Sequence, residues 1–314
     1  MSRIFVAGAS GAIGRPLVAK LVSAGHEVTG MTRSDRSAEA IRTAGARAAV
    51  VDVFDAGAVR DAVAEARPDV LVHELTALPE RFQPRNKRIY DATNRVRTEG
   101  TPNLIAAARE AGTRRFICQS IAFAYRPAAE PRVVAEDAPL FTDAPAPFGD
   151  AVKALGEMER LVLGADSLEG VVLRYGWFYG PGTYFAQDGS TTRDVRKRRF
   201  PVVGGGGGLW SFIHVDDAAD ATVASVERGA AGVYNVVDDE PGAMRDWLPV
   251  LAHALGAKPP RRVPVWLARL VAGGAAATMA TVLPGASNAK AKRELGWQPA
   301  HESWRRGFAQ SLQA

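Results

Sequence analysis

The sequence predicts an α/β fold: a doubly wound parallel sheet with a smaller C-terminal lobe. Two observations carry this prediction. Short apolar segments of strand length alternate with segments of helical period over roughly the first 240 residues. The first apolar segment, 4–7, runs into a glycine-rich turn at 8–14, and an apolar pattern of helical period begins at once. Such a sheet has its ligand crevice at the C-terminal ends of the strands.

Three glycines, Gly8, Gly11 and Gly14, stand between the first strand and the first helix. A dinucleotide pyrophosphate must approach backbone amides at a helix N-terminus, where unpaired N–H groups and the helix dipole favour an anion. A Cβ at Gly8 or Gly11 obstructs that approach, and Gly14 lets the helix pack closely on the strand. An accidental glycine-rich turn is the alternative, since glycine makes up 31 of the 314 residues. The residues expected to hold the pyrophosphate are Gly8, Ser10, Gly11, Ala12, Ile13 and Gly14.

The end of the second strand indicates which dinucleotide binds. An acidic residue there accepts hydrogen bonds from the adenosine ribose, as NAD binding requires. Here Thr32, Arg33 and Ser34 offer donors for a 2′-phosphate, so the sequence favours NADP over NAD. A charged hydrogen bond contributes about 1.5–3 kcal/mol. Asp35 is the counter-evidence, and we expect it to cap the following helix instead.

Composition excludes several classes of protein. The net charge is +5, but acids separate the Lys and Arg residues along the chain, so no nucleic-acid-binding stripe is expected. The single cysteine, Cys118, excludes an internal disulfide and a cysteine-rich metal site, and we expect no metal. No basic segment followed by an apolar run opens the chain, so we expect a cytoplasmic protein. The apolar stretch 266–283 is too short and interrupted for a bilayer span, so no stable membrane association is expected.

Several motifs together resemble the extended, atypical branch of the short-chain dehydrogenase/reductase superfamily, which includes NAD-dependent epimerases and dehydratases. They are the glycine turn, Leu173-Arg174-Tyr175, Tyr179-Gly180-Pro181-Gly182, the segment 213–218 and the terminal Leu295-Gly296-Trp297. The resemblance covers nearly the whole chain. It implies a dinucleotide-binding domain over 1–173, to which a strand near 232–237 returns, and a mainly substrate-binding lobe over 174–314. Members often pair through two helices, so a homodimer is an expectation.

The resemblance also implies further cofactor contacts. In members, an acid and a hydrophobe at the end of the third strand lie against the adenine, and Asp52 and Val53 match in the strand predicted over 50–55. A strand-end turn is the alternative role for Asp52. At the end of the fourth strand, predicted over 69–78, the residues expected to line the nicotinamide ribose are Leu75, Thr76 and Ala77, while His73 is expected to be a packed core histidine. Tyr175 is a further expected cofactor contact.

The family's hallmark is incomplete in this chain. Tyr-x-x-x-Lys places a proton-donating tyrosine and a lysine on one helix face. Lys153 is present and is expected to hold the nicotinamide ribose, but the tyrosine position is Gly149. Glycine cannot transfer a proton, and a positioned acid or base typically contributes ~10²–10⁴ in rate.

Other side chains are candidates for the missing function. Tyr125 is favoured, because it follows the end of the fifth strand, and Asp150, Tyr175 and Tyr179 are alternatives. Ser120 is the nearest candidate for the hydroxyl that binds the substrate carbonyl in members. If the strand is aligned through Tyr125 instead, the position of that hydroxyl falls on Ile121, which has none. The assignment of the hydroxyl to Ser120 therefore stays open.

These observations predict an NADP(H)-dependent oxidoreductase that acts on a carbonyl or alcohol of a small organic substrate. The predicted catalytic residues are Ser120, Tyr125 and Lys153, and Tyr179 and Tyr184 are predicted to border the substrate. One alternative is a sugar-nucleotide epimerase or dehydratase with tightly held NAD(P). A non-catalytic NADP(H) sensor is the other, because Gly149 removes the usual proton donor.

Overall fold

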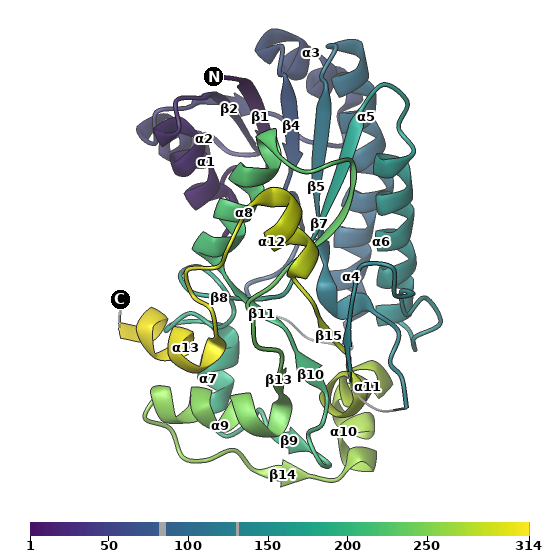
Figure 1. The fold of residues 1–314 in the computed structure, drawn as a ribbon, viewed down its shortest axis with the longest axis vertical. Coiled ribbons are helices and arrows are strands. Elements are labelled where there is room, and N and C mark those ends of the chain that lie inside the picture. Colours follow the sequence, from purple (N-terminus) through teal and green to yellow (C-terminus); the bar gives the residue numbers. More distant parts are fainter. Residues whose placement is uncertain (82–85, 130–131, 314) are drawn as a thin grey trace.

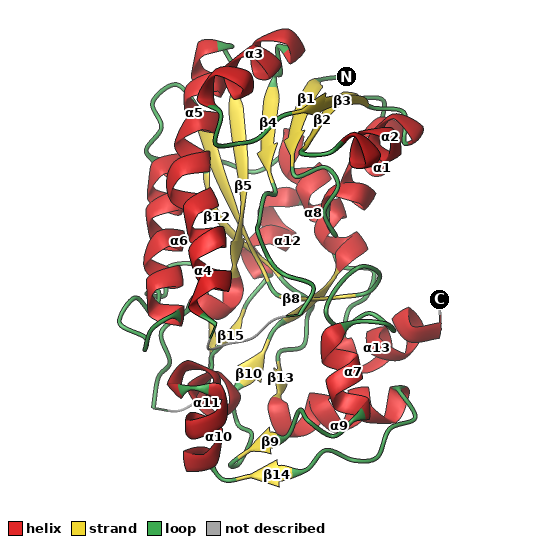
Figure 2. Ribbon diagram, turned by 180° about the vertical axis from the view of Figure 1, so that it is seen from behind, coloured by secondary structure: helices red, strands yellow, loops and turns green. Residues whose placement is uncertain are grey.

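The computed structural model describes residues 1–81, 86–129 and 132–313. Seven parallel strands form the central sheet in the order β12-β7-β5-β4-β1-β2-β3, which confirms the predicted doubly wound fold (Figures 1 and 2). Their bounds are β1 Arg3–Ala7, β2 Glu27–Thr32, β3 Arg47–Val50, β4 Val70–His73, β5 Arg115–Ile121, β7 Glu169–Tyr175 and β12 Gly232–Val236.

Helices cover both faces of this sheet because successive strand side chains point to opposite sides and both sets are apolar. One face carries α1 Gly14–Ser23, α2 Asp35–Thr43, α8 Val215–Glu227 and α12 Ala289–Leu295. The other carries α3 Ala56–Ala66, α4 Lys87–Arg95, the π-helical turn Val96–Gly100, α5 Thr101–Glu110 and α6 Phe148–Leu163 (Figure 2). Cys118 is fully buried in the middle of β5.

The remaining elements form a smaller lobe in the lower half of Figure 1. Its helices are α7 Ser190–Arg196, α9 Met244–Ala254, α10 Val265–Ala272, α11 Gly274–Val282 and α13 Trp304–Gln313. Its short strands pair as β8 Trp177–Tyr179 with β11 Phe212–His214, β9 Val202–Val203 with β14 Arg262–Val263, and β10 Leu209–Trp210 with β13 Gly242–Ala243. β6 Val133–Val134 pairs with β15 Gly285–Ala286 between the two parts. Within the described ranges, none of the helices has the length and apolar character needed to cross a bilayer.

Two strands differ from their predicted bounds. The third spans Arg47–Val50 and not 50–55, because Asp52 accepts the N–H of Phe54 and Asp55 caps α3, which turns the chain away from the sheet. The fourth ends at His73, whose ring nitrogen accepts the N–H of Leu75. Asp52 and Leu75 therefore lie just past the strand ends.

The predicted cap at Asp35 is wrong, because this residue lies inside its helix. α2 begins at Asp35, and Ser34 is the N-cap, accepting the N–H of Ser37 at 3.3 Å. α8 begins at Val215, and the ring of His214 accepts the N–H of Asp216 at 3.2 Å, so neither Asp216 nor Asp217 is the cap. Asp217 instead accepts the backbone N–H groups of residues 300 and 301.

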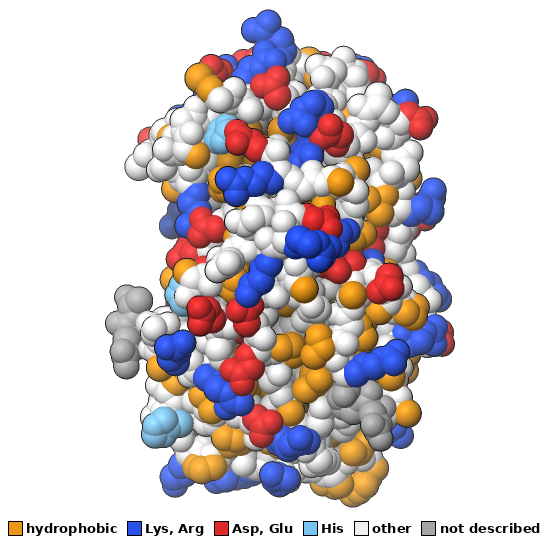
Figure 3. All heavy atoms as spheres, viewed as in Figure 1, with side chains coloured by type: hydrophobic (Ala, Val, Ile, Leu, Met, Phe, Trp, Pro, Cys, Tyr) orange, Lys and Arg blue, Asp and Glu red, His pale blue; other side chains and the backbone are white. Residues whose placement is uncertain are grey.

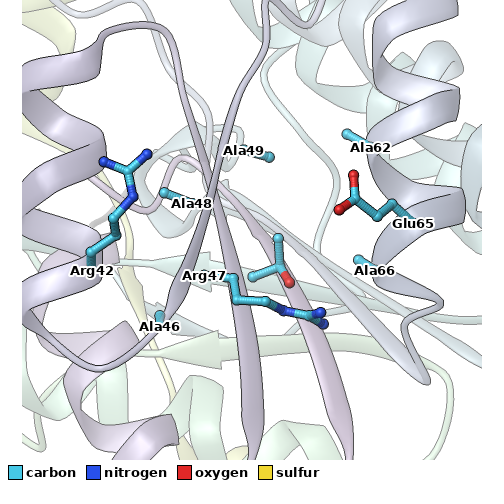
Figure 4. A pocket seen from close by; sticks show the side chains of 9 residues that line it. Arg42, Ala46, Arg47, Ala48, Ala49, Ala62, Glu65 and Ala66 are labelled. Carbon is cyan, nitrogen blue, oxygen red and sulfur yellow. The ribbon is translucent and has the colours of Figure 1, made fainter.

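The surface shows charges of both signs side by side on the face drawn in Figure 3. An open pocket lies where α2, α3 and the edge strand β3 meet (Figure 4). Its lining residues are Thr29, Arg42, Ala46, Arg47, Ala48, Ala49, Ala62, Glu65 and Ala66. Thr29 and Arg47 pair with one another before the C-terminal ends of β2 and β3, so this pocket is not at the predicted ligand edge of the sheet.

Candidate active site

The glycine turn is fixed by close backbone packing. Gly8 has a φ of +96°, and a Cβ added there would lie 2.8 Å from the backbone carbonyl carbon of Glu74. A Cβ at Gly14 would lie 2.1 Å from the carbonyl oxygen of Gly8. No side chain fits at either position, so the turn is held against both β4 and α1.

The same turn presents free backbone donors. The N–H groups of Ala12 and Ile13 make no hydrogen bond with any described residue, and they precede α1 directly. The hydroxyl of Ser10 lies 3.3 Å from that of Thr32, which joins the turn to the end of β2. Unpaired amides at the N-terminus of a ten-residue helix suit an anionic diphosphate.

Arg33 is the exposed cation at the end of β2. Among described residues it has no ion pair, so its guanidinium is available to a ligand. The Ser34 hydroxyl is committed to capping α2 and donates to Ser37 at 3.0 Å. Of the three polar residues predicted at this end, Arg33 is thus the one whose side chain has no partner in the described part of the protein.

Asp52 and Val53, the predicted adenine contacts, are neighbours in the chain that differ in solvent exposure. Asp52 is exposed, whereas Val53 is buried. The Val53 carbonyl accepts a hydrogen bond from the side-chain amide of Asn103 at 2.9 Å, and a Cβ at Gly100 would touch the Val53 side chain at 3.0 Å. This turn is therefore anchored to α5.

The loop after β4 is also tied to its neighbours. Leu75 and Ala77 are half-buried and Thr76 is exposed. The carbonyl of Leu75 accepts from the Gln119 side chain at 3.4 Å, and the N–H of Ala77 donates to the hydroxyl of Thr93 at 3.3 Å. His73 is fully buried, and burial lowers its pKa to about 4, so it is a neutral core residue.

Two predicted catalytic hydroxyls belong to one buried network. Ser120 donates to Glu159 at 2.6 Å, and Arg174 holds the same carboxylate with two hydrogen bonds of 2.9 and 2.6 Å. Arg174 also donates to the hydroxyl of Tyr125 at 2.9 Å, and that hydroxyl donates to Asn235 at 2.6 Å. Although burial opposes the charged form, Glu159 raises the pKa of Arg174. The network joins β5, β7, β12 and α6 beneath the C-terminal edge of the sheet.

The third predicted catalytic residue lies apart from this network. Lys153 is exposed on α6, while Ser120 and Tyr125 are almost completely buried. The structure therefore brings Ser120 and Tyr125 together but not Lys153. Their catalytic roles stay predictions.

Position 149, where the sequence predicts the motif tyrosine to be replaced by glycine, has no room for a side chain. Gly149 is buried in the first turn of α6, under the segment 144–147. A Cβ added there would lie 2.0 Å from the carbonyl oxygen of Ala144. The glycine is therefore required by packing.

Tyr175 is fully buried at the end of β7 and contacts another buried acid. Its hydroxyl donates to Oε1 of Glu74 at 2.9 Å and lies 2.7 Å from that of Thr222. Burial raises the pKa of Glu74 to about 8, and its Oε2 has no hydrogen-bond partner among the described residues. Glu74 was not among the residues predicted from the sequence, although an acid directly after an apolar strand was an available signal.

Arg97 is a second missed residue. It lies in the π-helical turn Val96–Gly100, and such turns are frequent at functional sites. Its Nη1 donates to the carbonyl of Ala151 at 3.2 Å and to Asn94 at 3.4 Å, while its Nε is buried without a described partner. Burial lowers the pKa of Arg97 to about 10. No sequence signal separates it from the exposed arginines nearby.

The two tyrosines predicted to border the substrate differ in accessibility. Tyr179 is buried in the small lobe, where its ring packs edge-on against Phe212 and Phe308. Tyr184 is half-buried, and its hydroxyl donates to the carbonyl of Pro79 at 2.7 Å, in the segment that follows β4. Of the two, Tyr184 is the one that contacts the segment after β4.

Comparison with known proteins places this geometry in a family. Residues 4–237 match the model of the NAD dependent epimerase/dehydratase family. A 3-diazoavenalumate denitrifying reductase of a Streptomyces species is 47% identical over 308 residues, which cover 98% of this chain and 99% of that protein. A 2-alkyl-3-oxoalkanoate reductase of Stenotrophomonas maltophilia is 28% identical over 267 residues, 81% of this chain and 76% of that protein.

Solved structures share the fold. The UDP-glucose 4-epimerase of Thermotoga maritima, solved with UDP-glucose, has a TM-score of 0.78 at 20% identity and covers 99% of this chain and 97% of its own. A human epimerase family protein, solved with NADPH, has a TM-score of 0.74 at 21% identity and covers 99% of both chains. The resemblance seen in the sequence motifs is confirmed: the chain belongs to the NAD dependent epimerase/dehydratase family, and the relative that is 47% identical to it is a reductase.

Proposed function

We propose that this chain is an NADPH-dependent reductase that delivers hydride to a carbon carrying a diazonium group. Its 47% identical relative, matched over almost the full length of both proteins, has a name that joins a diazo substrate, loss of nitrogen and reduction. The geometry of the site gives an independent reason to favour such a substrate.

The cofactor assignment has two supports. Ala12 and Ile13 present N–H groups that no described residue accepts, at the start of α1, where a pyrophosphate would bind. Arg33 is exposed and free of ion pairs with described residues at the strand end where a 2′-phosphate would lie. When bound, NADPH would supply the hydride. We propose that Lys153 holds its nicotinamide ribose and that Asp52, Val53 and the loop 75–77 line its path.

The observation that carries the choice of substrate is the packing at Gly149. Reduction of a carbonyl forms an alcohol and needs a proton as well as a hydride. Reduction of an arenediazonium ion forms a C–H bond from the hydride, and the C–N bond breaks as its electron pair leaves in N₂. This step balances without a proton. A site with no space for the proton-donating tyrosine, and with Ser120 and Tyr125 held in a buried network, fits the second reaction.

A carbonyl substrate is the second candidate. Two relatives of about 28% identity support it by name, the 2-alkyl-3-oxoalkanoate reductase and a quinoline-1-oxide ketoreductase of Stigmatella aurantiaca. This reaction would require a proton from Ser120, Tyr125 or water.

Transfer of deuterium from the cofactor distinguishes these reactions. The purified chain is given NADPH deuterated at C4 and either a stable arenediazonium salt or a panel of ketones, and the products are analysed by mass spectrometry. We expect deuterium on the arene carbon that lost nitrogen, at a rate well above the reaction without protein. Deuterated alcohol from ketones, with no enhancement for the diazonium salt, would support the carbonyl reductase and overturn this proposal.

The remaining alternatives give other outcomes in the same preparation. A nicotinamide that remains bound through purification, with conversion of a sugar nucleotide, would identify an epimerase or dehydratase. Tight NADPH binding without turnover of any substrate would identify a sensor. Gly14→Val, which fills the space occupied by the turn, provides the inactive control.

A further inference from the structure

We infer that Phe123 and Trp177 form the surface on which the substrate binds, and that the substrate presents a planar aromatic ring to it. This inference deepens the proposed function and rests on it for the position of the hydride donor. The observations are the place of the two residues in the fold, their stacking and their partial exposure.

Both residues lie at the ligand edge of the sheet. Phe123 is in the short turn Ala122–Ala124 that directly follows β5, and Trp177 is two residues past the end of β7. β5 and β7 are neighbours, with Ile121 opposite Tyr175 at their last pair. Ligands of such sheets bind outside the carboxyl ends of the strands, so two adjacent strands deliver an aromatic side chain each to that edge.

The two rings begin a continuous stack. Their centroids are 3.9 Å apart with an interplanar angle of 16°. Trp177 stacks in turn on Trp210 at 4.4 Å and 22°, and Trp210 contacts Trp247, which is fully buried. The outer rings are therefore held in place by the core of the small lobe, and little ordering is needed when a ligand binds.

One end of the stack is accessible. Phe123 and Trp177 are both half-buried, whereas Trp210 and Trp247 are buried. Since Trp177 covers one face of Phe123, the rest of the Phe123 surface is its opposite face and its edge. A planar ring placed on that face would continue the stack. Aromatic pairs contribute about 0.5–1.5 kcal/mol beyond the area they bury, and a cationic ring gains further attraction from an aromatic face.

The aromatic face, and not a polar atom of the stack, defines the ligand. The indole Nε1 atoms of Trp177, Trp210 and Trp247 are all buried and have no hydrogen-bond partner in the described part of the chain. A ring on the outer face of Phe123 is separated from the Trp177 indole by Phe123 itself, so it does not reach that buried N–H. The ligand class is thus a planar arene.

Binding of stable probes to the NADPH-loaded protein tests this inference by titration calorimetry. The probes are 8-hydroxyquinoline, a planar arene with an oxygen, and its fully saturated analogue, 8-hydroxydecahydroquinoline, with UDP-glucose as a third ligand. We expect 8-hydroxyquinoline to bind and the saturated analogue to bind at least ten-fold more weakly. Equal binding of the two, or tighter binding of UDP-glucose, would overturn the inference.

Matched variants place the probe on the stack. Phe123→Leu keeps an apolar side chain but removes the ring, and we expect it to weaken 8-hydroxyquinoline binding by about three- to ten-fold. Trp266→Leu is the control, since Trp266 is 67% exposed on α10 in the small lobe and should not change binding. Trp177→Phe keeps an aromatic ring behind Phe123, so we expect a smaller loss than in Phe123→Leu. Unchanged binding in Phe123→Leu, with an unchanged melting temperature, would contradict the assignment.

The outcomes separate this inference from the proposed function. Ring binding that depends on Phe123, without deuterium transfer to any diazonium salt, would disprove the proposed reaction and support the aromatic surface. Deuterium transfer with full activity in Phe123→Leu and Trp177→Phe would disprove the surface and support the reaction.

Discussion

The hydroxyl of Tyr175 donates a 2.9 Å hydrogen bond to Oε1 of Glu74 and thereby joins the end of β7 to the end of β4. Glu74 also supports the glycine turn, because its backbone leaves no space for a Cβ at Gly8. Burial raises the pKa of this carboxyl from 4.5 to about 8, so the group is neutral in the folded protein at pH 7. A buried, protonated acid therefore lies directly behind the predicted pyrophosphate site.

Glu74 makes the stability of the fold depend on pH. Above pH 4.5 the carboxyl ionises in the unfolded chain but stays protonated in the folded one, so the free energy of unfolding falls as pH rises from 4.5 to about 8. The side chain of Glu74→Gln cannot ionise, so this variant should lose the fall in the free energy of unfolding, which amounts to roughly 2–4 kcal/mol. Urea denaturation at pH 5.5 and 8.5 measures it. Glu157→Gln, an exposed acid on α6, serves as the control, and a wild-type pH dependence retained in Glu74→Gln would contradict this role of the carboxyl.

Gly14→Ala should abolish dinucleotide binding. Its Cβ would meet the carbonyl oxygen of Gly8 at 2.1 Å, which forces the turn away from its present course. We expect the affinity for NADPH, measured by fluorescence titration, to fall by at least 100-fold. Gly57→Ala is the matched control, because its Cβ meets only a side-chain oxygen of Asp55 at 3.4 Å. If both variants bind NADPH like the wild type, the ligand does not occupy this turn.

Arg33→Asp should reverse the preference for NADPH over NADH. The substitution removes a charged donor for the 2′-phosphate and adds an acceptor for the ribose hydroxyls that NADH retains. A lost charged hydrogen bond of about 1.5–3 kcal/mol corresponds to roughly a 10- to 100-fold weaker affinity for NADPH. Arg36→Asp, an exposed arginine in the first turn of α2, controls for the change in net charge. Equal losses in the two variants would show that only long-range charge is involved.

Ser120→Ala separates a structural from a catalytic role. The hydroxyl donates to Glu159 at 2.6 Å in a fully buried setting, so its loss should reduce the free energy of unfolding by about 1–3 kcal/mol. If Ser120 serves only this network, kcat of the folded variant stays within about three-fold of wild type. A fall of 100-fold or more in kcat, with KM unchanged, would instead confirm the catalytic role predicted from the sequence.

The sequence predicted the sheet and the cofactor turn because both depend on local patterns. Apolar runs and three glycines specify β1, the turn and α1 without reference to distant residues. The polar network was not predictable in the same way: Ser120, Glu159 and Arg174 are far apart in sequence, and only the parallel pairing of β5 with β7 brings them together. Arg97 was missed for a related reason, since its burial depends on the contact of its π-helical turn with α6.

Gly149 gives the most direct test of the predicted departure from the Tyr-x-x-x-Lys motif. The absence of tyrosine could reflect a changed residue in an unchanged site, or a site whose backbone excludes any side chain. The structure supports a site whose backbone excludes any side chain, because the carbonyl oxygen of Ala144 occupies the place of a Cβ at position 149. Gly149→Ala should therefore destabilise the protein by about 2–4 kcal/mol. Gly156→Ala, in the same helix but with only an ordinary 3.6 Å contact, should stabilise it by about 0.5–1 kcal/mol.

Restoring the hallmark should fail for the same steric reason. Gly149→Tyr recreates Tyr-x-x-x-Lys with Lys153, yet its side chain cannot enter the site without displacing the segment 144–147. We expect it to melt at a lower temperature than wild type and to gain no ketone reduction, whereas in an otherwise unchanged site a proton donor would add about 10²–10⁴ in rate. Ketone turnover that rises in Gly149→Tyr, with stability preserved, would show that the backbone at this position can yield and that only the residue type has changed.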